Sequence, residues 1–328
     1  MSVLISMTLA VIIWSLYPLA AVFGLKTMTS LELIILATVI SAITSNIFSV
    51  IHLKRKNLLR PAIQQYKNFD RSSYFYIAGA AITTLACHAL FFTALTMSHK
   101  GGVSLIYESW PIIALIATPF LIKKQWKQVS FKEFLVSLIA LGGMATVILS
   151  DQNIDLPFVS SSEKTLEQVN FAVLLGYIIA FIGAYTCAMS VVLKAVVAQF
   201  HKDLNNTIAS TSLSEFYTRN IGVALIIIAY PFLHQYINYS NVHWPSVLFI
   251  GVFVMFFGGM FYNHSLVNTD RPTIHIIYYL VPLFAVIVLW LSGESTINSG
   301  LFIGGMIIVT SNIYLYFAGR KAKFSDPL

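Results

Sequence analysis

Charged residues are scarce in this sequence of 328 residues, since Asp, Glu, Lys and Arg together make up only 10% of it. A soluble domain usually carries about 25%, whereas this chain is 57% hydrophobic and has a mean hydropathy of +0.78. Most of its surface is therefore expected to face something other than water. At roughly 20 apolar residues for each membrane crossing, the chain has room for about ten spanning helices with short loops.

Cysteine is also scarce. Cys87 and Cys187 are the only two, and both lie inside apolar runs, so they are expected to be small buried thiols rather than a structural disulfide. No basic leader or small-residue cleavage site precedes the first apolar run, which begins at Val3. That run is therefore expected to be a retained span rather than a removed signal peptide.

The motifs of common enzyme and metal sites are missing from the sequence. It has no His/Cys/Asp cluster at metal spacing, no Gly-rich phosphate loop followed by Lys, and no Ser nucleophile motif. We therefore predict a protein that is not an enzyme, that holds no metal and no cofactor, and that does not hydrolyse ATP.

Ten apolar runs are present, and each is long enough to cross a membrane. The predicted spans are 3–24, 31–53, 73–98, 103–122, 131–149, 171–198, 213–233, 244–267, 272–291 and 299–318. A basic connector after the second span is too polar to enter lipid. The sequence thus predicts an all-α polytopic membrane protein with a first five-helix repeat (1–150), an acidic external linker (151–170) and a second five-helix repeat (171–328).

Basic residues gather on one side of these spans. Sixteen lie in the even-numbered connecting segments and after the last span, against three on the opposite side, namely Lys26, Lys100 and Lys164. The sixteen are Lys54, Arg55, Lys56, Arg60, Lys67, Arg71, Lys123, Lys124, Lys127, Lys132, Lys194, Lys202, Arg271, Arg320, Lys321 and Lys323. By the positive-inside rule both termini are expected in the cytoplasm, in a multi-pass protein of a bacterial-type inner membrane. This bias also explains the net charge of +7 without nucleic acid as a partner.

The second half of the sequence repeats the first at an offset of 171 residues. The matching pairs are Leu95 and Leu266, Lys100 and Arg271, Ile106 and Ile277, Tyr107 and Tyr278, Pro111 and Pro282, with Trp14 and Tyr185 at the same offset. Because five spans per repeat is an odd number, the second copy is inverted. Inverted repeats are typical of secondary transporters, whose substrate site lies near the bilayer midplane between the halves.

Several stretches resemble a known family. They are IIWSLYPLAAVFG, FFTALTMSHKGGVSLIYESWPIIALIATPFL and FLVSLIALGGMATVILS in the first half, and AFIGAYTCAMSVVLK, TDRPTIHIIYYLVPLFAVIVLWLSGE and GLFIGGMIIVTSN in the second. On these residues the whole chain resembles the drug/metabolite transporter superfamily, in its ten-helix EamA-like branch. YESWP and AFIGAYTCA look most like the aromatic amino-acid exporters of that family. One departure is that Gly293-Glu294 ends the ninth span, whereas Lys123-Lys124 ends the fourth.

Glu108 is the leading candidate for a substrate-binding residue. It lies about six residues inside the fourth span, where a carboxylate is costly and is functional by default. It is expected to bind a substrate cation or a proton, or else to tie helices together through His88 or a hydroxyl. His88 is predicted at a similar depth on the third span, and a His–carboxylate pair can exchange a proton near neutral pH.

Aromatic residues form the second group of candidates. If their spans line the cavity, the rings would stack on a planar or amphipathic solute, and the alternative is an interfacial belt. The set is Trp14, Tyr17, Tyr107, Trp110, Tyr185, Tyr262, Tyr278 and Tyr279. Asn263 is expected in the interior as a further substrate-binding residue.

Two further pairs are predicted to shape the gates. Glu215 and Arg219 share a helix face at spacing i, i+4 and are expected to pair near the cytoplasmic surface, as part of an inner gate. Pro111 and Pro282 each remove a backbone donor and are expected to kink their helices. Gly142-Gly143 and Gly304-Gly305 are expected to serve close helix packing.

The resulting prediction is a secondary transporter that exports a small amphipathic metabolite by alternating access, with aromatic amino acids favoured. The alternatives are a carrier for a nucleoside-like or cationic metabolite or drug, or, in other classes, a channel or a membrane-embedded enzyme. Neither of these last two explains an inverted repeat. The expected partners are the small-molecule substrate, the lipid bilayer and protons as the coupling ion.

Overall fold

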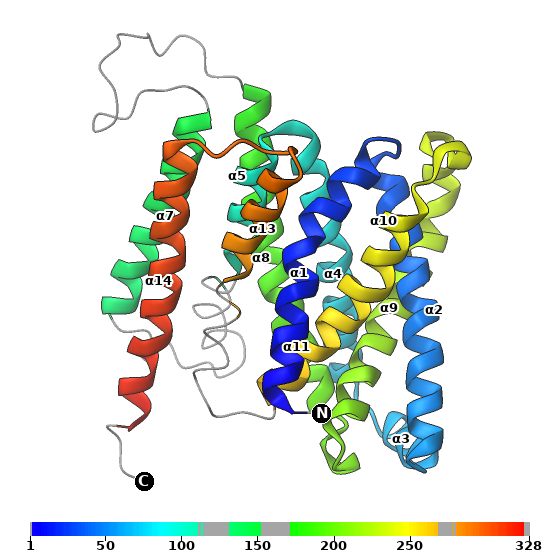
Figure 1. The fold of residues 1–328 in the computed structure, drawn as a ribbon. Coiled ribbons are helices and arrows are strands. Elements are labelled where there is room, and N and C mark those ends of the chain that lie inside the picture. The colour runs from blue at the N-terminus through cyan, green and yellow to red at the C-terminus, as the bar shows by residue number, and fades with distance from the viewer. Residues whose placement is uncertain are drawn as a thin grey trace, which may run out of the picture.

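The computed structural model describes residues 2–110, 113, 131–151, 171–267, 278 and 280–324. Within these ranges the chain is helical throughout and forms no strand. Its long helices stand side by side in one bundle (Figure 1). Among the described residues, six helices are long and apolar enough to cross a membrane: Val3–Leu25, Ser30–Arg55, Arg71–Met97, Phe171–Gln199, Thr207–Tyr236 and Trp244–Ser265.

The first half consists of α1 (Val3–Leu25), α2 (Ser30–Arg55), α3 (Leu59–Lys67), α4 (Arg71–Met97), α5 (Lys100–Tyr107) and α7 (Phe131–Asp151). In the second half lie α8 (Phe171–Gln199), α9 (Thr207–Leu233), α13 (Val281–Leu291) and α14 (Ser299–Phe324). Between α9 and α13, α10 (Trp244–Leu248) continues through the π-helix η6 (Phe249–Gly258) into α11 (Gly259–Val267). The eighth predicted span is covered by α10, η6 and α11 together, and the others, apart from the fourth and ninth, each correspond to one helix.

Helix α9 begins six residues before its predicted span. The Asn206 side chain caps it by accepting a hydrogen bond from the Ala209 N–H at 3.0 Å. The first two turns are rich in Ser and Thr, which lowers their hydropathy. Their hydroxyls bond to backbone carbonyls, as Thr211 does to Thr207 at 2.8 Å, so this polar start is buried without loss of hydrogen bonds.

The fourth and ninth spans are interrupted. Helix α5 ends at Tyr107, with Glu108 as its C-cap, and α13 begins only at Val281. Pro282 therefore lies in the first turn of α13, directly after the break at Leu280, rather than inside an unbroken helix. In a first turn its missing N–H costs no hydrogen bond. Pro111 and most of the predicted external linker lie outside the described residues.

The connector after α2 contains α3, a short helix that the sequence analysis did not predict. Its apolar side, with Leu58, Leu59 and Ala62, packs against Leu204 and Leu213 at one end of the bundle. Since α3 covers only this end (Figure 1), the conclusion that the connector stays out of the lipid is consistent with the fold.

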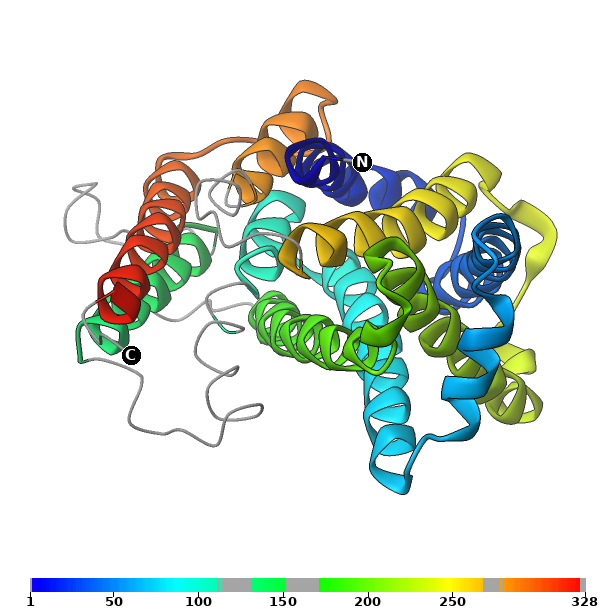
Figure 2. The ribbon, with the colours of Figure 1, turned by 90° about the horizontal axis from the view of Figure 1, so that it is seen from below.

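The two halves pack as inverted copies. The 171-residue offset carries α1 onto α8, α4 onto α10–η6–α11 and α7 onto α14. Helix α4 packs on α8 as η6 and α11 pack on α1, and these contacts join the two halves. Two further contacts between the halves pair equivalent helices, α2 with α9 and α7 with α14. Figure 1 shows α1 and α8 running in opposite directions, and Figure 2 shows α7 and α14 together at one edge of the bundle.

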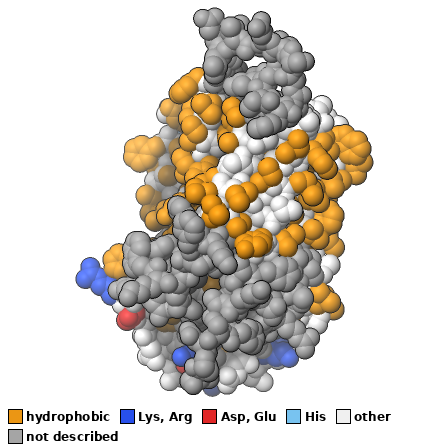
Figure 3. Space-filling model, turned by 90° about the vertical axis from the view of Figure 1, so that its left-hand side faces the viewer, with side chains coloured by type: hydrophobic (Ala, Val, Ile, Leu, Met, Phe, Trp, Pro, Cys, Tyr) orange, Lys and Arg blue, Asp and Glu red, His pale blue; other side chains and the backbone are white. Residues whose placement is uncertain are grey.

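The sides of the bundle expose large apolar side chains. Phe75, Ile227, Phe232 and Phe302 are each more than half exposed. Figure 3 shows hydrophobic side chains spread over the described part of one face, with the Lys and Arg side chains in its lower part. Such a wide apolar surface is expected where lipid takes the place of water.

Candidate functional site

A buried cavity lies where the two halves meet. Its volume of about 40 Å³ is room for a few water molecules. Six predicted residues line it: Trp14, Tyr17, His88, Tyr107, Glu108 and Trp110. The lining also holds Arg219 and eight residues not proposed as site residues: Cys87, Cys187, Ser190, Val191, Lys194, Val254, Met255 and Gly259.

Glu108 reaches the cavity because α5 is short and packs closely on α8. Gly102, in the first turn of α5, permits this approach, since a Cβ there would lie 2.7 Å from the Tyr177 hydroxyl. Glu108 is 2% exposed, and its Oε2 accepts a hydrogen bond from the Tyr278 hydroxyl at 3.1 Å. The acid of the first half is thus bonded to a tyrosine of the second.

His88 lines the same cavity from α4. Its Nδ1 shares a hydrogen bond of 2.7 Å with the Tyr17 hydroxyl, whereas Glu108 bonds to Tyr278. The direct His88–Glu108 pair considered from the sequence is therefore not formed. Each of the two titratable groups has its own tyrosine partner instead. Both thiols that line the cavity are free, as predicted.

Four aromatic rings form one cluster beside the cavity. The Trp14 ring centroid lies 6.3 Å from that of Trp110, 5.1 Å from Tyr262 and 5.4 Å from Tyr278. The Trp14 Nε1–H donates to the Val254 carbonyl of η6 at 3.3 Å. A π-helical stretch shifts the backbone register, and such stretches recur at functional sites.

The glycine pair Gly258-Gly259 at the end of η6 makes room for this cluster and for a set of charges. A Cβ on Gly258 would lie 2.5 Å from the Trp14 Nε1, and one on Gly259 would lie 2.5 Å from the Glu215 Oε1. This dipeptide was a signal in the sequence that we did not use.

Of the eight aromatic candidates, Tyr262 and Tyr278 belong to the cluster beside the cavity rather than to its lining. Two more are not placed in the cavity. Tyr185 is 50% exposed, so its prediction as a cavity residue is wrong. The inward face of α8 carries Ala180, Ala184 and Ala188. Tyr185 follows Ala184 by one residue, which turns it by about 100° to the outer face. Tyr279 lies outside the described residues.

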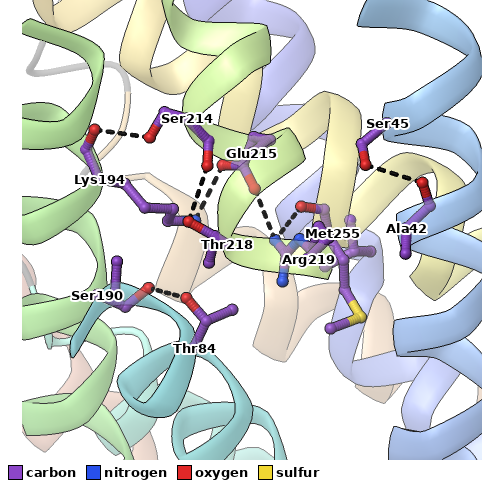
Figure 4. Close-up of polar contacts among 12 residues, drawn as sticks. Ala42, Ser45, Thr84, Ser190, Lys194, Ser214, Glu215, Thr218, Arg219 and Met255 are labelled. Carbon is purple, nitrogen blue, oxygen red and sulfur yellow. Dashed lines mark hydrogen bonds and ion pairs between the residues drawn. The ribbon is translucent and has the colours of Figure 1, made fainter. Parts of the chain in front are cut away.

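Glu215 and Arg219 do pair, but in the protein interior rather than near the surface. The Arg219 Nη2 lies 3.0 Å from the Glu215 Oε2, and the Lys194 Nζ lies 3.0 Å from the Glu215 Oε1 (Figure 4). The Arg219 Nη2 also donates to the Met255 carbonyl. The three side chains are 0–6% exposed. Lys194, counted above among the loop charges, is thus a buried residue of α8.

Asn263 is buried in α11 at 1% exposure, as predicted for an interior residue, but it is not part of the cavity lining. Among the described residues its Oδ1 has no hydrogen-bond partner. Within that same part of the chain, no group of His, Cys, Asp and Glu is arranged to hold a metal ion.

A helical membrane bundle of two inverted halves with a cavity between them is the architecture of a secondary transporter. The model of the EamA-like transporter family matches residues 1–149 and 174–317. The chain belongs to this family, and it is a multi-pass membrane protein that transports small solutes. This confirms the all-α polytopic fold class and the resemblance seen in the sequence.

Comparison with solved structures shows a similarity of fold and nothing more. A solved structure titled "Crystal structure of protein" aligns with a TM-score of 0.56 over 98% of this chain and 99% of that chain, at 15% sequence identity. No curated protein matches the sequence.

Proposed function

We propose that this transporter exports small amphipathic metabolites, with aromatic amino acids as the favoured substrates. The observation that carries the proposal is the cavity wall, which combines Trp14, Trp110 and Tyr17 with a buried carboxylate, Glu108. Aromatic rings prefer edge-to-face and offset contacts with other rings. A buried carboxylate can pair with the ammonium group of a substrate at a membrane depth where water does not solvate that charge.

The size of the cavity supports alternating access as the mechanism. A volume of about 40 Å³ is too small for an aromatic amino acid, so substrate binding must widen it. The halves are inverted copies, and each can supply the gate on its own side of the cavity. The protein lies in the inner membrane with both termini in the cytoplasm, as the distribution of basic residues favours.

Protons are the proposed coupling ion. Glu108 and His88 are titratable groups that line the cavity and are each bonded to a tyrosine hydroxyl. Loss or gain of a proton at either group would change its attraction for a charged solute. Amino-acid flux that is independent of pH and survives an uncoupler would rule this coupling out.

The rival substrate is a nucleoside-like or cationic metabolite, with Glu108 as its counter-charge. Lys194 and Arg219 line the same cavity, and they would repel a purely cationic solute. This wall therefore favours an amino acid over a cation.

Flux into proteoliposomes tests the proposal. Labelled Trp or Phe should enter vesicles that contain the protein, with saturation, and excess unlabelled amino acid should compete better than nucleosides or amines. Flux equal to that of empty vesicles would reject amino acids as substrates, and flux without saturation would indicate a channel.

Two variants, each lacking one aromatic ring, make this test more specific. Trp14→Ala removes a cavity ring and should lower flux by about tenfold or more, because a stacking partner is lost. Tyr185→Ala, the matched control, removes a ring from the outer face of α8 and should leave flux unchanged. Equal effects of the two variants would show that the cavity rings do not bind substrate.

A further inference from the structure

Two buried cations face the cavity, while the carboxylate that they share lies behind them. Lys194 and Arg219 are both part of the cavity lining, and Glu215 is not. The Glu215 side chain is 0% exposed and divides its two oxygens between them, one to each cation at 3.0 Å. Two positive charges are therefore held by one negative charge.

The hydrogen bonds of this cluster are also incomplete. Arg219 is 2% exposed, and among the described residues its Nε has no hydrogen-bond partner. A guanidinium carries five N–H donors in a planar fork that suits a carboxylate. Burying a cation without full compensation is costly. In the described part of the chain, the unpartnered Nε–H of Arg219 and the excess positive charge therefore leave the cluster able to accept an anion.

Hydrogen bonds fix the backbone beside the cations, and the Arg219 guanidinium itself donates to the Met255 carbonyl. The Ser214 hydroxyl donates to the Lys194 carbonyl at 2.8 Å, and the Thr218 hydroxyl donates to the Ser214 carbonyl at 2.8 Å (Figure 4). A Cβ at Gly259 would come within 3.5 Å of the Lys194 Nζ, so glycine there leaves the space for the pair.

We propose that Lys194 and Arg219 form the carboxylate-binding pole of the cavity, opposite in charge to Glu108, so that the site binds a zwitterionic amino acid. The ammonium group of the substrate pairs with Glu108. The carboxylate of the substrate pairs with Lys194 and Arg219, whose two positive charges are only half neutralised by Glu215. The apolar walls between the poles hold the side chain. The role of this pole in transport rests on the proposed function, whereas binding at the pole can be tested separately.

A monoanion fits this pole better than a dianion. The cluster of Lys194, Glu215 and Arg219 has one excess positive charge, and a phosphate dianion would leave a second negative charge unpaired in a buried site. A carboxylate also accepts two parallel bonds from a guanidinium fork.

Binding of four probes to the purified protein tests the proposal by thermal shift and titration calorimetry. They are L-tryptophan, indole-3-propionate, which lacks the amine, tryptamine, which lacks the carboxylate, and inorganic phosphate. Tryptophan should bind at least about tenfold more tightly than either analogue, because each analogue loses one charge-assisted contact. Tryptamine binding as tightly as tryptophan, or phosphate binding more tightly than indole-3-propionate, would overturn the proposal.

The key variant is Lys194→Met, which leaves Glu215 and Arg219 as a neutral pair and should therefore still fold. This variant should weaken the binding of tryptophan and of indole-3-propionate by about tenfold or more and leave the binding of tryptamine unchanged. Lys202→Met, at an exposed position just beyond α8, is the control and should change none of them. An equal loss for all probes in Lys194→Met would mark Lys194 as structural and reject the pole.

The opposite variant frees both cations. Glu215→Gln should tighten binding of indole-3-propionate, whereas a structural role predicts only a lower Tm. Failure of this inference is distinguishable from failure of the proposed function. If tryptophan is transported with an unchanged KM in Lys194→Met, the pole is wrong and amino-acid transport stands. If indole-3-propionate binds in a Lys194-dependent way but tryptophan is not transported, the pole stands and the proposed substrate is wrong.

Discussion

Glu108 is the residue at which sequence and structure agree most usefully. A carboxylate in an apolar run predicts function, and the structure buries it beside the cavity at 2% exposure. Its position as the C-cap of α5 was not predicted, because apolar residues continue past it and periodicity does not show a helix break. The interruption places the carboxylate at the end of a half-helix, as in other transporters with discontinuous helices.

Glu108→Gln keeps the size of the side chain and can still accept the Tyr278 hydrogen bond, but it removes the negative charge. We expect amino-acid flux in proteoliposomes to fall by about tenfold or more, since a charge-assisted contact is lost, with little change in Tm. Asp203→Asn, an exposed acid beyond α8, is the control and should transport normally. Undiminished flux in Glu108→Gln would remove Glu108 from the substrate site.

His201 predicts a pH-dependent stability at the end of the bundle that carries α3. His201 follows α8, and its Nδ1 shares a hydrogen bond of 2.8 Å with the Gln65 Oε1 of α3. Burial lowers the pKa of His201 from 6.5 to about 4. The unfolded chain therefore binds a proton in this range that the folded chain does not. The contribution of His201 to the free energy of unfolding is fully present above pH 6.5 and is lost as pH falls towards about 4.

We accordingly expect Tm to decrease between pH 7 and pH 4.5, and His201→Gln to remove part of that decrease. The exposed His234→Gln variant is the control and should keep all of it. A wild-type Tm that does not change over this range would contradict the assignment.

At the scale of elements, the packing of α7 on α14 depends on close approaches at glycine. A Cβ on Gly143 would lie 2.9 Å from the Gly304 carbonyl oxygen, whereas nothing lies within 4 Å of one on Gly142. Of the two glycine pairs predicted to serve packing, Gly143 and Gly304 make the close approach between the helices. Small residues at such crossings let backbones meet closely.

Gly143→Val should separate α7 from α14, because overpacking of this kind costs about 1–3 kcal/mol. In a chain of this size that corresponds to a Tm decrease of several degrees, measured in detergent. Gly142→Val has the same chemistry at the open position and should have a much smaller effect. Similar losses from both variants would argue against the contact.

A second element-scale feature closes the end of the bundle opposite to the chain termini. Glu294, in the turn after α13, bridges Lys26 after α1 and Lys100 at the start of α5, the latter at 2.7 Å. Lys100 and then Lys26 lower the pKa of Glu294 below its ordinary 4.5, so the bridge is charged at neutral pH and weakens only as pH falls below that value. The bridge joins the turn of one half to two helices of the other.

Glu294→Gln should loosen this end of the protein. In purified protein that carries Ser295→Cys, a buried neighbour at 7% exposure, we expect a thiol reagent to react several times faster when Glu294 is replaced. The parent without Ser295→Cys corrects for Cys87 and Cys187, and Lys54→Gln serves as a surface control. An unchanged rate would show that the bridge does not restrict this end.

For the whole molecule, the inverted halves fix the topology. The start of α1 and the end of α14 lie at the same end of the bundle (Figure 1). A C-terminal fusion to green fluorescent protein should therefore fluoresce, and a C-terminal alkaline phosphatase fusion should be inactive, if that end is cytoplasmic. Alkaline phosphatase inserted at Glu163, in the predicted external linker, should be active. The reverse pattern would invert the proposed orientation.

The sequence by itself determined the class of this protein and the positions of its helices. Apolar runs of spanning length and a 171-residue repeat depend only on composition and order along the chain, so helix bounds such as those of α1, α4 and α8 could be predicted closely. Buried acids and aromatic residues also pointed to the cavity, because such side chains are rare or amphipathic at membrane depth.

Only the tertiary structure decided which side chains share the cavity. Helix rotation turns Tyr185 outwards and Lys194 inwards, and in a helix that is apolar on all sides no polar face reveals this rotation. The pairing of Lys194 with Glu215 joins α8 to α9, and contacts between helices leave no mark in local periodicity. The sequence therefore contains the charged residues that we assign to substrate recognition, but it does not show that they lie together at one site.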